Sequence, residues 1–251
     1  MISCRGLTRR FGTFTAVDNL TLDIPAGAIC AFLGPNGAGK STTLKMLTGL
    51  LPPSAGRAEV RGLDVAARPL ELKRRIGVLP EELGLFDDLT VEEHLLLTGD
   101  VYGLDRRQTR ERTGQLLRAL SLEHGRRTFA RACSHGMRKK TALAMALLPN
   151  PRALFLDEPF EAVDPATSRI LRDLLETLAR RGVTVFLTSH ILALVERVAT
   201  QVVMIRQGKM VWNSPTAEIA SSLEDHYFDL VESPAVENLE WLGAPPASGQ
   251  P

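Results

Sequence analysis

Short runs of apolar residues alternate along the chain with stretches whose apolar positions recur at helical spacing. The apolar runs show no polar alternation, which is typical of strands buried on both faces in a parallel sheet covered by helices. These runs are residues 28–33, 153–156, 183–187 and 202–205. The pattern therefore predicts an α/β fold with a mainly parallel sheet flanked by helices.

One of the predicted helices has clear boundaries in the sequence. Asp164 is a typical N-cap, Pro165 suits the first helical position, and Gly182 follows the end of a helical pattern over residues 168–181. This helix lies between the apolar runs 153–156 and 183–187, so the three segments form a βαβ unit.

Two regions depart from this alternation. Residues 1–27 and 56–65 carry short strand patterns with turns, which predicts a small antiparallel β subdomain. Residues 87–148 are almost entirely helical in pattern, and the capping box Thr90–Glu93 places a helix start at Thr90. We predict a core that includes the β subdomain (1–86 and 149–231), an inserted helical subdomain (87–148) and a loosely ordered tail (232–251).

Composition limits the classes of function. The chain has 251 residues, 44% of them hydrophobic, which is enough for a sizeable core. Thirty Lys and Arg against 29 Asp and Glu leave a net charge of +1, so any anion site must be local. Three distant cysteines favour neither a zinc site nor disulfides and indicate a reducing, cytosolic setting. No stretch approaches the roughly 18 apolar residues of a membrane span, so work at a membrane requires another chain to cross it.

The strongest chemical signal is a glycine-rich loop with the pattern G-x-x-x-x-G-K-[ST] over residues 34–41. It follows an apolar strand and precedes a helical pattern over residues 42–50, so its N–H groups and the helix dipole favour phosphate. Lys40 supplies charge at the β- and γ-phosphates, and the Ser41 hydroxyl is a ligand for Mg²⁺. The candidate nucleotide-binding residues are Gly34, Pro35, Asn36, Gly37, Ala38, Gly39, Lys40, Ser41 and Thr42.

Two adjacent carboxylates end the apolar run 153–156. A charge at the end of a buried strand costs desolvation unless something binds it. Asp157 fits a second Mg²⁺ ligand, and Glu158 fits a base that takes a proton from an attacking water. Together with the loop, these residues predict hydrolysis of a nucleoside triphosphate.

The order of these motifs over residues 2–230 resembles the ATP-binding subunit of an ABC transporter. The resemblance implies ATP and Mg²⁺ as cofactors, and it matches residues 133–137, Cys-Ser-His-Gly-Met, to the family's Leu-Ser-Gly-Gly-Gln signature. Ser134 would cap a helix running to Leu148 and, with Gly136, contact the γ-phosphate held by a second cassette. His135 and Met137 depart from the usual pattern, and by its residues alone the segment indicates only an N-cap.

Further positions follow from the same resemblance. His190 matches the switch histidine at the γ-phosphate and joins Lys40 and Glu158 as a catalytic candidate. Asp164 matches a loop that touches the opposite subunit and contributes to its nucleotide site.

Two positions of the resemblance leave alternatives. Phe11 or, less favoured, Phe14 would stack on adenine. Glu81 stands where the family has a metal-reaching glutamine and is therefore a third candidate metal ligand, although the neighbouring Glu82 allows an alignment shifted by one residue. A carboxylate at this position ligates Mg²⁺ but donates no hydrogen bond.

Two surface patterns bear on partners. Residues 126–140 carry six Lys or Arg and no acid, but Phe129 is their one aromatic residue, which is poor material for base stacking. A solvated or phosphate-attracting face is favoured, and no nucleic-acid partner is expected. Leu83, Leu85 and Phe86 form an apolar patch that is either core or a docking place for a helix of a membrane partner.

The resemblance implies an ATPase that dimerises head-to-tail around two ATP with an identical or different cassette and drives a separate transmembrane permease. The Ser-His-Gly-Met variant and the segment 221–230 resemble the exporter branch, which implies a peripheral place at the cytoplasmic face of the membrane. The alternative is a non-transport ABC ATPase acting on nucleic acid or ribosomes, a class that usually carries two cassettes or long coiled coils. A P-loop kinase or GTPase is disfavoured because the guanine-reading N-K-x-D pattern is missing from the sequence, and intact Lys40, Asp157 and Glu158 oppose a binding module without catalysis.

Overall fold

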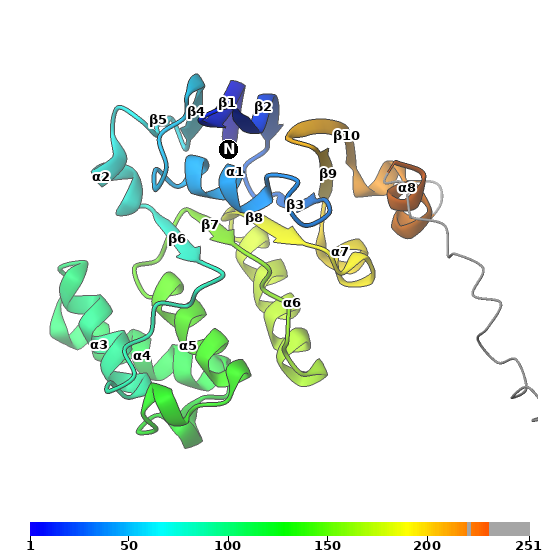
Figure 1. Ribbon diagram of the computed structural model, residues 1–251. Coiled ribbons are helices and arrows are strands. Elements are labelled where there is room, and N and C mark those ends of the chain that lie inside the picture. The colour runs from blue at the N-terminus through cyan, green and yellow to red at the C-terminus, as the bar shows by residue number, and fades with distance from the viewer. Residues whose placement is uncertain (220–221, 231–251) are drawn as a thin grey trace, which may run out of the picture.

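The computed structural model describes residues 1–219 and 222–230, which form two β-sheets and a set of surrounding helices (Figure 1). The strands are β1 (Ile2–Phe11), β2 (Phe14–Ile24), β3 (Ile29–Leu33), β4 (Ala55–Val60), β5 (Leu63–Asp64), β6 (Ile76–Leu79), β7 (Ala153–Leu156), β8 (Thr184–Ser189), β9 (Gln201–Arg206) and β10 (Lys209–Pro215). The α-helices are α1 (Lys40–Leu47), α2 (Pro69–Lys73), α3 (Val91–Val101), α4 (Arg106–Ala119), α5 (His135–Leu147), α6 (Pro165–Arg180), α7 (Leu192–Val198) and α8 (Leu223–Leu230). Short 3₁₀ turns cover Glu123–Gly125, Ala130–Ala132 and Thr216–Glu218.

The larger sheet has the strand order β10-β9-β3-β8-β7-β6. Its strands are parallel except for the edge strand β10, which pairs antiparallel with β9. The expected α/β fold with a mainly parallel sheet is confirmed, and the four predicted strands appear as β3, β7, β8 and β9, with ends displaced by at most two residues. The helix predicted between Asp164 and Gly182 is present as α6.

Both faces of this sheet are buried, which explains the continuous apolar runs. In β3, Cys30 and Phe32 point into a cluster formed with α1 and the smaller sheet. The alternate residues Ile29, Ala31 and Leu33 point into a second cluster that includes residues of α5 and α6. A strand covered on both sides cannot alternate apolar and polar residues without burying the polar ones.

The smaller sheet has the order β2-β1-β4-β5 and is antiparallel, as expected for residues 1–27 and 56–65. The expectation of short strands is wrong for β1 and β2, which run for 10 and 11 residues. Register shifts interrupt their pairing between Cys4 and Arg10, so the strict alternation of a long strand is broken in the sequence.

Between β6 and β7 the chain forms the predicted helical region, which lies beside the larger sheet in Figure 1. Thr90 caps α3 in a complete capping box with Glu93. The Glu93 N–H donates a hydrogen bond to the Thr90 hydroxyl, and the Thr90 N–H and hydroxyl both donate to the Glu93 carboxylate. The two bonds that the carboxylate accepts lower the pKa of Glu93. Helix α5 ends at Leu147, with Leu148 as its C-cap.

The division of the chain at residues 86 and 148 stays a prediction. Residue 231 and the tail 232–251 lie outside the described residues, as does Ser221 of the segment 221–230. In the part of the chain that the structure describes, no helix is both long and apolar enough to cross a membrane.

Candidate nucleotide-binding site

The glycine-rich loop joins the end of β3 to the start of α1. Helix α1 begins at Lys40, two residues before the predicted helical pattern, and Gly39 occupies its N-cap with φ +106°. A side chain at Gly39 would be strained by this φ and would also overlap the carbonyl oxygen of Ala16. The glycine therefore lets the loop turn closely enough to present the N-terminus of α1 to the cavity in front of it.

That cavity has a volume of about 400 Å³. Its size and the helix N-terminus at its floor suit a phosphate-bearing ligand. The lining residues are Phe14, Ala16, Pro35, Asn36, Gly37, Gly39, Lys40, Ser41, Thr42, Glu81 and Glu158.

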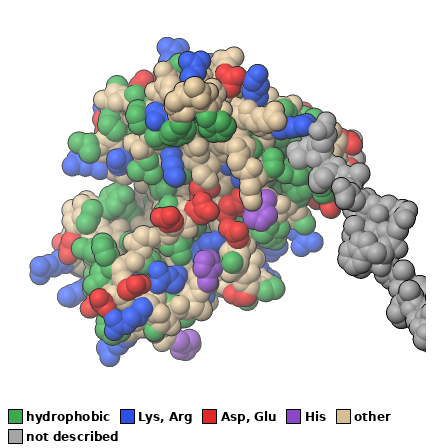
Figure 2. Space-filling view, in the orientation of Figure 1, with side chains coloured by type: hydrophobic (Ala, Val, Ile, Leu, Met, Phe, Trp, Pro, Cys, Tyr) green, Lys and Arg blue, Asp and Glu red, His purple; other side chains and the backbone are tan. Residues whose placement is uncertain are grey.

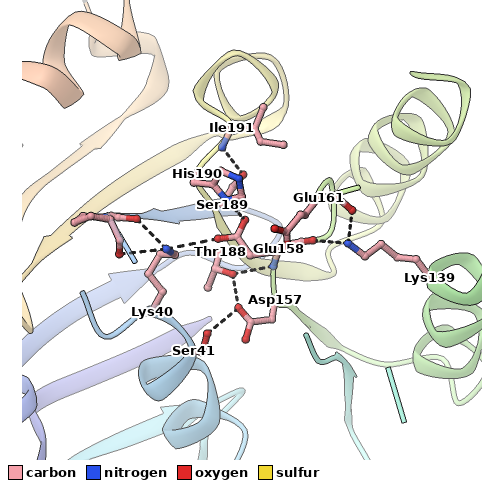
Figure 3. Close-up of polar contacts among 12 residues, drawn as sticks. Lys40, Ser41, Lys139, Asp157, Glu158, Glu161, Thr188, Ser189, His190 and Ile191 are labelled. Atoms are coloured by element: carbon pink, nitrogen blue, oxygen red, sulfur yellow. Dashed lines mark hydrogen bonds and ion pairs between the residues drawn. The ribbon is translucent and has the colours of Figure 1, made fainter. Parts of the chain in front are cut away.

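Lys40 lies in the wall of the cavity and is 7% exposed. Its Nζ donates hydrogen bonds to the carbonyl oxygens of Gly34 at 2.8 Å and Pro35 at 3.4 Å. The Oε1 atom of Glu158 lies 3.6 Å from the same Nζ. The ammonium is thus held at the cavity by the loop and by the carboxylate of Glu158, the predicted base (Figure 3).

Asp157 brings together β7, α1 and β8. It is 3% exposed, and its Oδ1 accepts hydrogen bonds from Ser41 Oγ at 3.2 Å and from Thr188 Oγ1 at 2.6 Å. Hydroxyl and carboxylate oxygens are the ligands that Mg²⁺ prefers, and Mg²⁺ is typically held by one or two carboxylates plus substrate phosphates. The pair Ser41 and Asp157 fits that ion. Ser41 and Glu81 line the cavity, and Asp157 reaches Ser41 from the end of β7.

Glu158 follows Asp157 and is held at both of its carboxylate oxygens. Oε2 lies 3.0 Å from Nδ1 of His190, while Oε1 faces Lys40. The Glu158 side chain is 12% exposed, whereas that of His190 is 47% exposed. Figure 2 shows acidic side chains gathered near the centre of this face with a histidine beside them. The three catalytic candidates, Lys40, Glu158 and His190, therefore form one connected group (Figure 3).

Other predicted residues are not brought to the cavity wall. Gly34 offers its carbonyl oxygen to Lys40, and Ala38 is buried in the core cluster behind the loop. Ser134, Gly136 and Asp164 do not line this cavity.

These last three residues lie at the N-termini of two neighbouring helices, α5 and α6. Ser134 Oγ accepts a hydrogen bond from Met137 N at 3.2 Å, and Asp164 accepts two from Thr167. Those bonds lower the pKa of the Asp164 carboxyl. A Cβ at Gly136 would lie 3.6 Å from Asp164 Oδ2, so the two helix ends are adjacent. They form a second polar surface within the chain.

The two open alternatives are placed by the structure. Phe14 lines the cavity, whereas Phe11 lies opposite it in the β1–β2 hairpin with its ring 4.6 Å from the Arg9 guanidinium carbon. Glu81 lines the cavity and Glu82 does not.

Three of the six basic residues of the segment 126–140 pair with acids of the preceding loop and of α3. Arg126, Arg131 and Arg138 form ion pairs with Glu92, Asp88 and Asp87. The segments also pair through backbone hydrogen bonds, including Ala130 N to Leu89 O and Glu92 N to Arg126 O. Paired arginines are less available to a phosphate backbone. The expectation of no nucleic-acid partner stays a prediction.

Sequence reasoning missed two polar residues of this site. Thr188 is not among the predicted site residues, although a threonine at the end of a buried parallel strand lies beside the carboxylate that ends the neighbouring strand. Lys139 was counted with the basic cluster, although it lies three, four and seven positions before buried Ala142, Leu143 and Ala146, which places it on the inner face of α5.

A glycine-rich loop lies between the buried strand β3 and a helix, and a carboxylate pair ends β7, the second strand along in the same parallel sheet. This arrangement defines the class of P-loop nucleotide-binding proteins. The family model for ABC transporters matches residues 17–161. The chain belongs to the ABC transporter family, as an ATP-binding subunit with the ATPase activity of that family.

Relatives and solved structures agree with this assignment. The chain is 36% identical to the daunorubicin/doxorubicin resistance ATP-binding protein DrrA of Streptomyces peucetius, covering 88% of this chain and 67% of that protein. It is 35% identical to the Nod factor export ATP-binding protein I of Burkholderia lata, covering 88% and 73%. A solved ATP-binding subunit of an ABC transporter superposes with a TM-score of 0.85 at 30% identity, covering 92% of this chain and 99% of that one. The ATP-binding cassette MJ0796 bound to ADP and Pi has the same fold, with a TM-score of 0.79 at 24% identity, covering 86% and 99%.

Proposed function

We propose that this subunit binds Mg-ATP in the cavity at the glycine-rich loop and hydrolyses it to drive a separate permease that exports its cargo. The observation that carries the proposal is the connected group Lys40, Glu158 and His190 at the N-terminus of α1. The backbone N–H groups of residues 36–42 and the Lys40 ammonium bind the phosphates. Phe14, with Phe11 opposite it, flanks the adenine ring.

In the proposed reaction Glu158 accepts a proton from the water that attacks the γ-phosphorus, and the bond from that phosphorus to the β,γ-bridging oxygen breaks. His190 orients the Glu158 carboxylate through Nδ1 and faces the γ-phosphate with the rest of its ring. Ser41 and Asp157, with Glu81, would hold Mg²⁺, which when bound neutralises charge on the phosphate oxygens.

A second cassette, identical or different, gives a function to Ser134, Gly136 and Asp164. Because they form a surface apart from the cavity of their own chain, they complete the site of a partner bound head-to-tail. The N–H groups at the start of α5 then face the γ-phosphate bound by that partner.

The permease is proposed to dock beside α3. A second cavity of about 490 Å³ lies between the larger sheet and the helical region, and its lining is mainly apolar. Phe86 and Val101 in its wall are 59% and 74% exposed, which is unusual for such side chains in the absence of a partner. Leu83 also lines this cavity, while Leu85 packs against the core. The apolar patch after Glu81 therefore contributes partly to the core and partly to the proposed docking surface. A cytoplasmic helix of a transmembrane protein fits this surface and places the subunit at the inner face of the membrane.

Export is proposed because relatives named above act in drug resistance and Nod factor export. The cargo itself would be selected by the permease.

The test combines two substitutions. Glu158→Gln keeps the shape of the side chain but loses the proton acceptor, so hydrolysis should fall by about 10²–10⁴-fold while ATP binding persists. The ATP-bound dimer should then accumulate, as measured by light scattering with and without Mg-ATP. Adding Ser134→Arg should dissolve it, because a bulky cation replaces the helix cap at the shared phosphate.

Glu161→Gln is the matched control, since this exposed glutamate of the same turn makes no side-chain bond to Lys40 or His190 in the described structure. It should hydrolyse ATP at the wild-type rate. Normal turnover by Glu158→Gln would refute the general-base assignment. Trapping that ignores Ser134→Arg, both in the isolated subunit and in the permease complex, would refute the assignment of residues 133–137 as a working signature.

A further inference from the structure

Lys139 is a buried lysine on α5, 4% exposed and on the helix face that packs inward. Lysine is rarely buried unless its ammonium is paired, because removing the charge from water is costly. Burial lowers the pKa of Lys139, and the nearby Glu161 and Glu158 carboxylates oppose that shift. The position of this charge therefore requires specific partners.

Its partners are two carbonyl oxygens of one turn. Lys139 Nζ donates to Glu158 O at 2.8 Å and to Glu161 O at 2.7 Å (Figure 3). This turn joins β7 to α6 and contains two non-glycine residues in the left-handed region, Glu158 with φ +44° and Ala162 with φ +51°. Such residues persist only where the surroundings hold them, and Lys139 supplies two of the contacts that do so.

The peptide groups of Glu158 are consequently fixed from both sides. Its N–H donates to Thr188 Oγ1 of β8 at 2.9 Å, and its carbonyl oxygen accepts from Lys139 of α5. The Glu158 side chain is 12% exposed, so it has little room to change its rotamer. The direction in which its carboxylate points is therefore set by the position of its backbone.

We propose that Lys139 is a positioning residue for ATP hydrolysis, acting through the backbone of Glu158. The same helix starts at Ser134, which is proposed to meet the nucleotide of the second cassette. Lys139 therefore connects that contact to the base of its own chain, so that a shift of α5 moves the Glu158 carbonyl directly. The inference rests on the proposed role of Glu158 as the general base.

The test uses three variants of the full chain. Lys139→Met keeps a long stem and removes the ammonium, Lys139→Arg restores donors, and Lys140→Met is the matched control on the next position of α5. Lys139→Met should lower kcat about 10–100-fold, since a misplacement near 1 Å costs on this order. Its KM for ATP should stay within about twofold of the wild-type value, as expected when only transition-state alignment is lost.

Lys139→Arg should recover a substantial part of kcat, and Lys140→Met should match the wild type. Thermal melts accompany each variant, because Lys139→Met leaves the carbonyl oxygens of Glu158 and Glu161 without this donor and should lower the stability. If Lys139→Met does not fold, Lys139→Gln takes its place, because the shorter amide cannot span both carbonyls. An unchanged kcat, or a loss shared equally by Lys140→Met, would overturn the proposal.

A double variant separates this inference from the function on which it rests. If Lys139 acts through Glu158, Lys139→Met should leave the residual single-turnover rate of Glu158→Gln nearly unchanged. Fully multiplicative losses would mean that Lys139 acts elsewhere and would contradict the inference. A Glu158→Gln protein that hydrolyses ATP normally would instead refute the proposed function itself.

Discussion

Replacing Thr188 by valine should destabilise the protein, although valine is a better residue for a buried strand. Thr188 is fully buried, and its hydroxyl donates to Asp157 Oδ1 at 2.6 Å and accepts from Glu158 N at 2.9 Å. A hydrogen bond to a charged group contributes about 1.5–3 kcal/mol, and an orphaned buried N–H costs about 1–3 kcal/mol. The added methyl group returns about 1 kcal/mol. The net loss in the free energy of unfolding should be about 1.5–5 kcal/mol.

The assay is urea unfolding of the nucleotide-free protein followed by circular dichroism. Thr188→Ser is the matched control, because it keeps both hydrogen bonds and loses one methyl group at a cost of about 1 kcal/mol. The expected order of stability is wild type, then Thr188→Ser, then Thr188→Val. In thermal melts the valine variant should unfold about 3–20 °C below the wild type.

The opposite order would refute the reasoning. Strand propensity and apolar burial both favour valine over serine at this position. If Thr188→Val is as stable as Thr188→Ser or more so, the hydroxyl contributes little. Asp157 and Glu158 would then be held by other contacts.

Two further predictions concern binding and docking. Lys40→Ala should abolish ATP hydrolysis while a thermal melt shows a folded protein, because the charge at the β- and γ-phosphates is lost, and wild-type turnover would contradict the assignment of the loop. Leu97 lies in the wall of the apolar cavity and is 40% exposed, so Leu97→Glu should reduce retention of the protein on membranes that contain a co-expressed permease. Leu70 is 76% exposed on α2 outside that cavity, so Leu70→Glu should leave this retention unchanged. Equal retention of the two leucine variants would exclude the proposed docking surface.

Features that depend on neighbours in the sequence were predictable. The N-caps at Thr90, Ser134 and Asp164 are all present, because capping is a contact between a side chain and a backbone N–H three residues later. The core strands were predictable as well, since burial on both faces leaves a continuous apolar run. Local chemistry thus located the loop, four strands of the larger sheet and the starts of α3, α5 and α6.

Features that depend on contacts between distant segments were not predictable. The hydroxyl of Thr188 meets Asp157 because β7 and β8 are adjacent and parallel. The βαβ pattern predicts these strands as a pair, but it does not give the register that brings the two side chains together. The ion pairs of segment 126–131 likewise require the loop that precedes α3 to fold back along it. A count of charges along the chain registers the arginines and misses their partners.

The unusual signature residues illustrate why a departure in sequence need not be a departure in mechanism. Met137 stands where the family has glutamine, and what the cap of α5 requires from it is the backbone N–H that reaches Ser134 Oγ. Its side chain turns toward Gly125, where any Cβ would overlap the Met137 methyl group, and packs against the core. His135 likewise contributes an N–H at the first helical position. If α5 has the role proposed for it, the donors that it offers to a γ-phosphate are backbone N–H groups, and these are the same whichever side chains occupy positions 135 and 137.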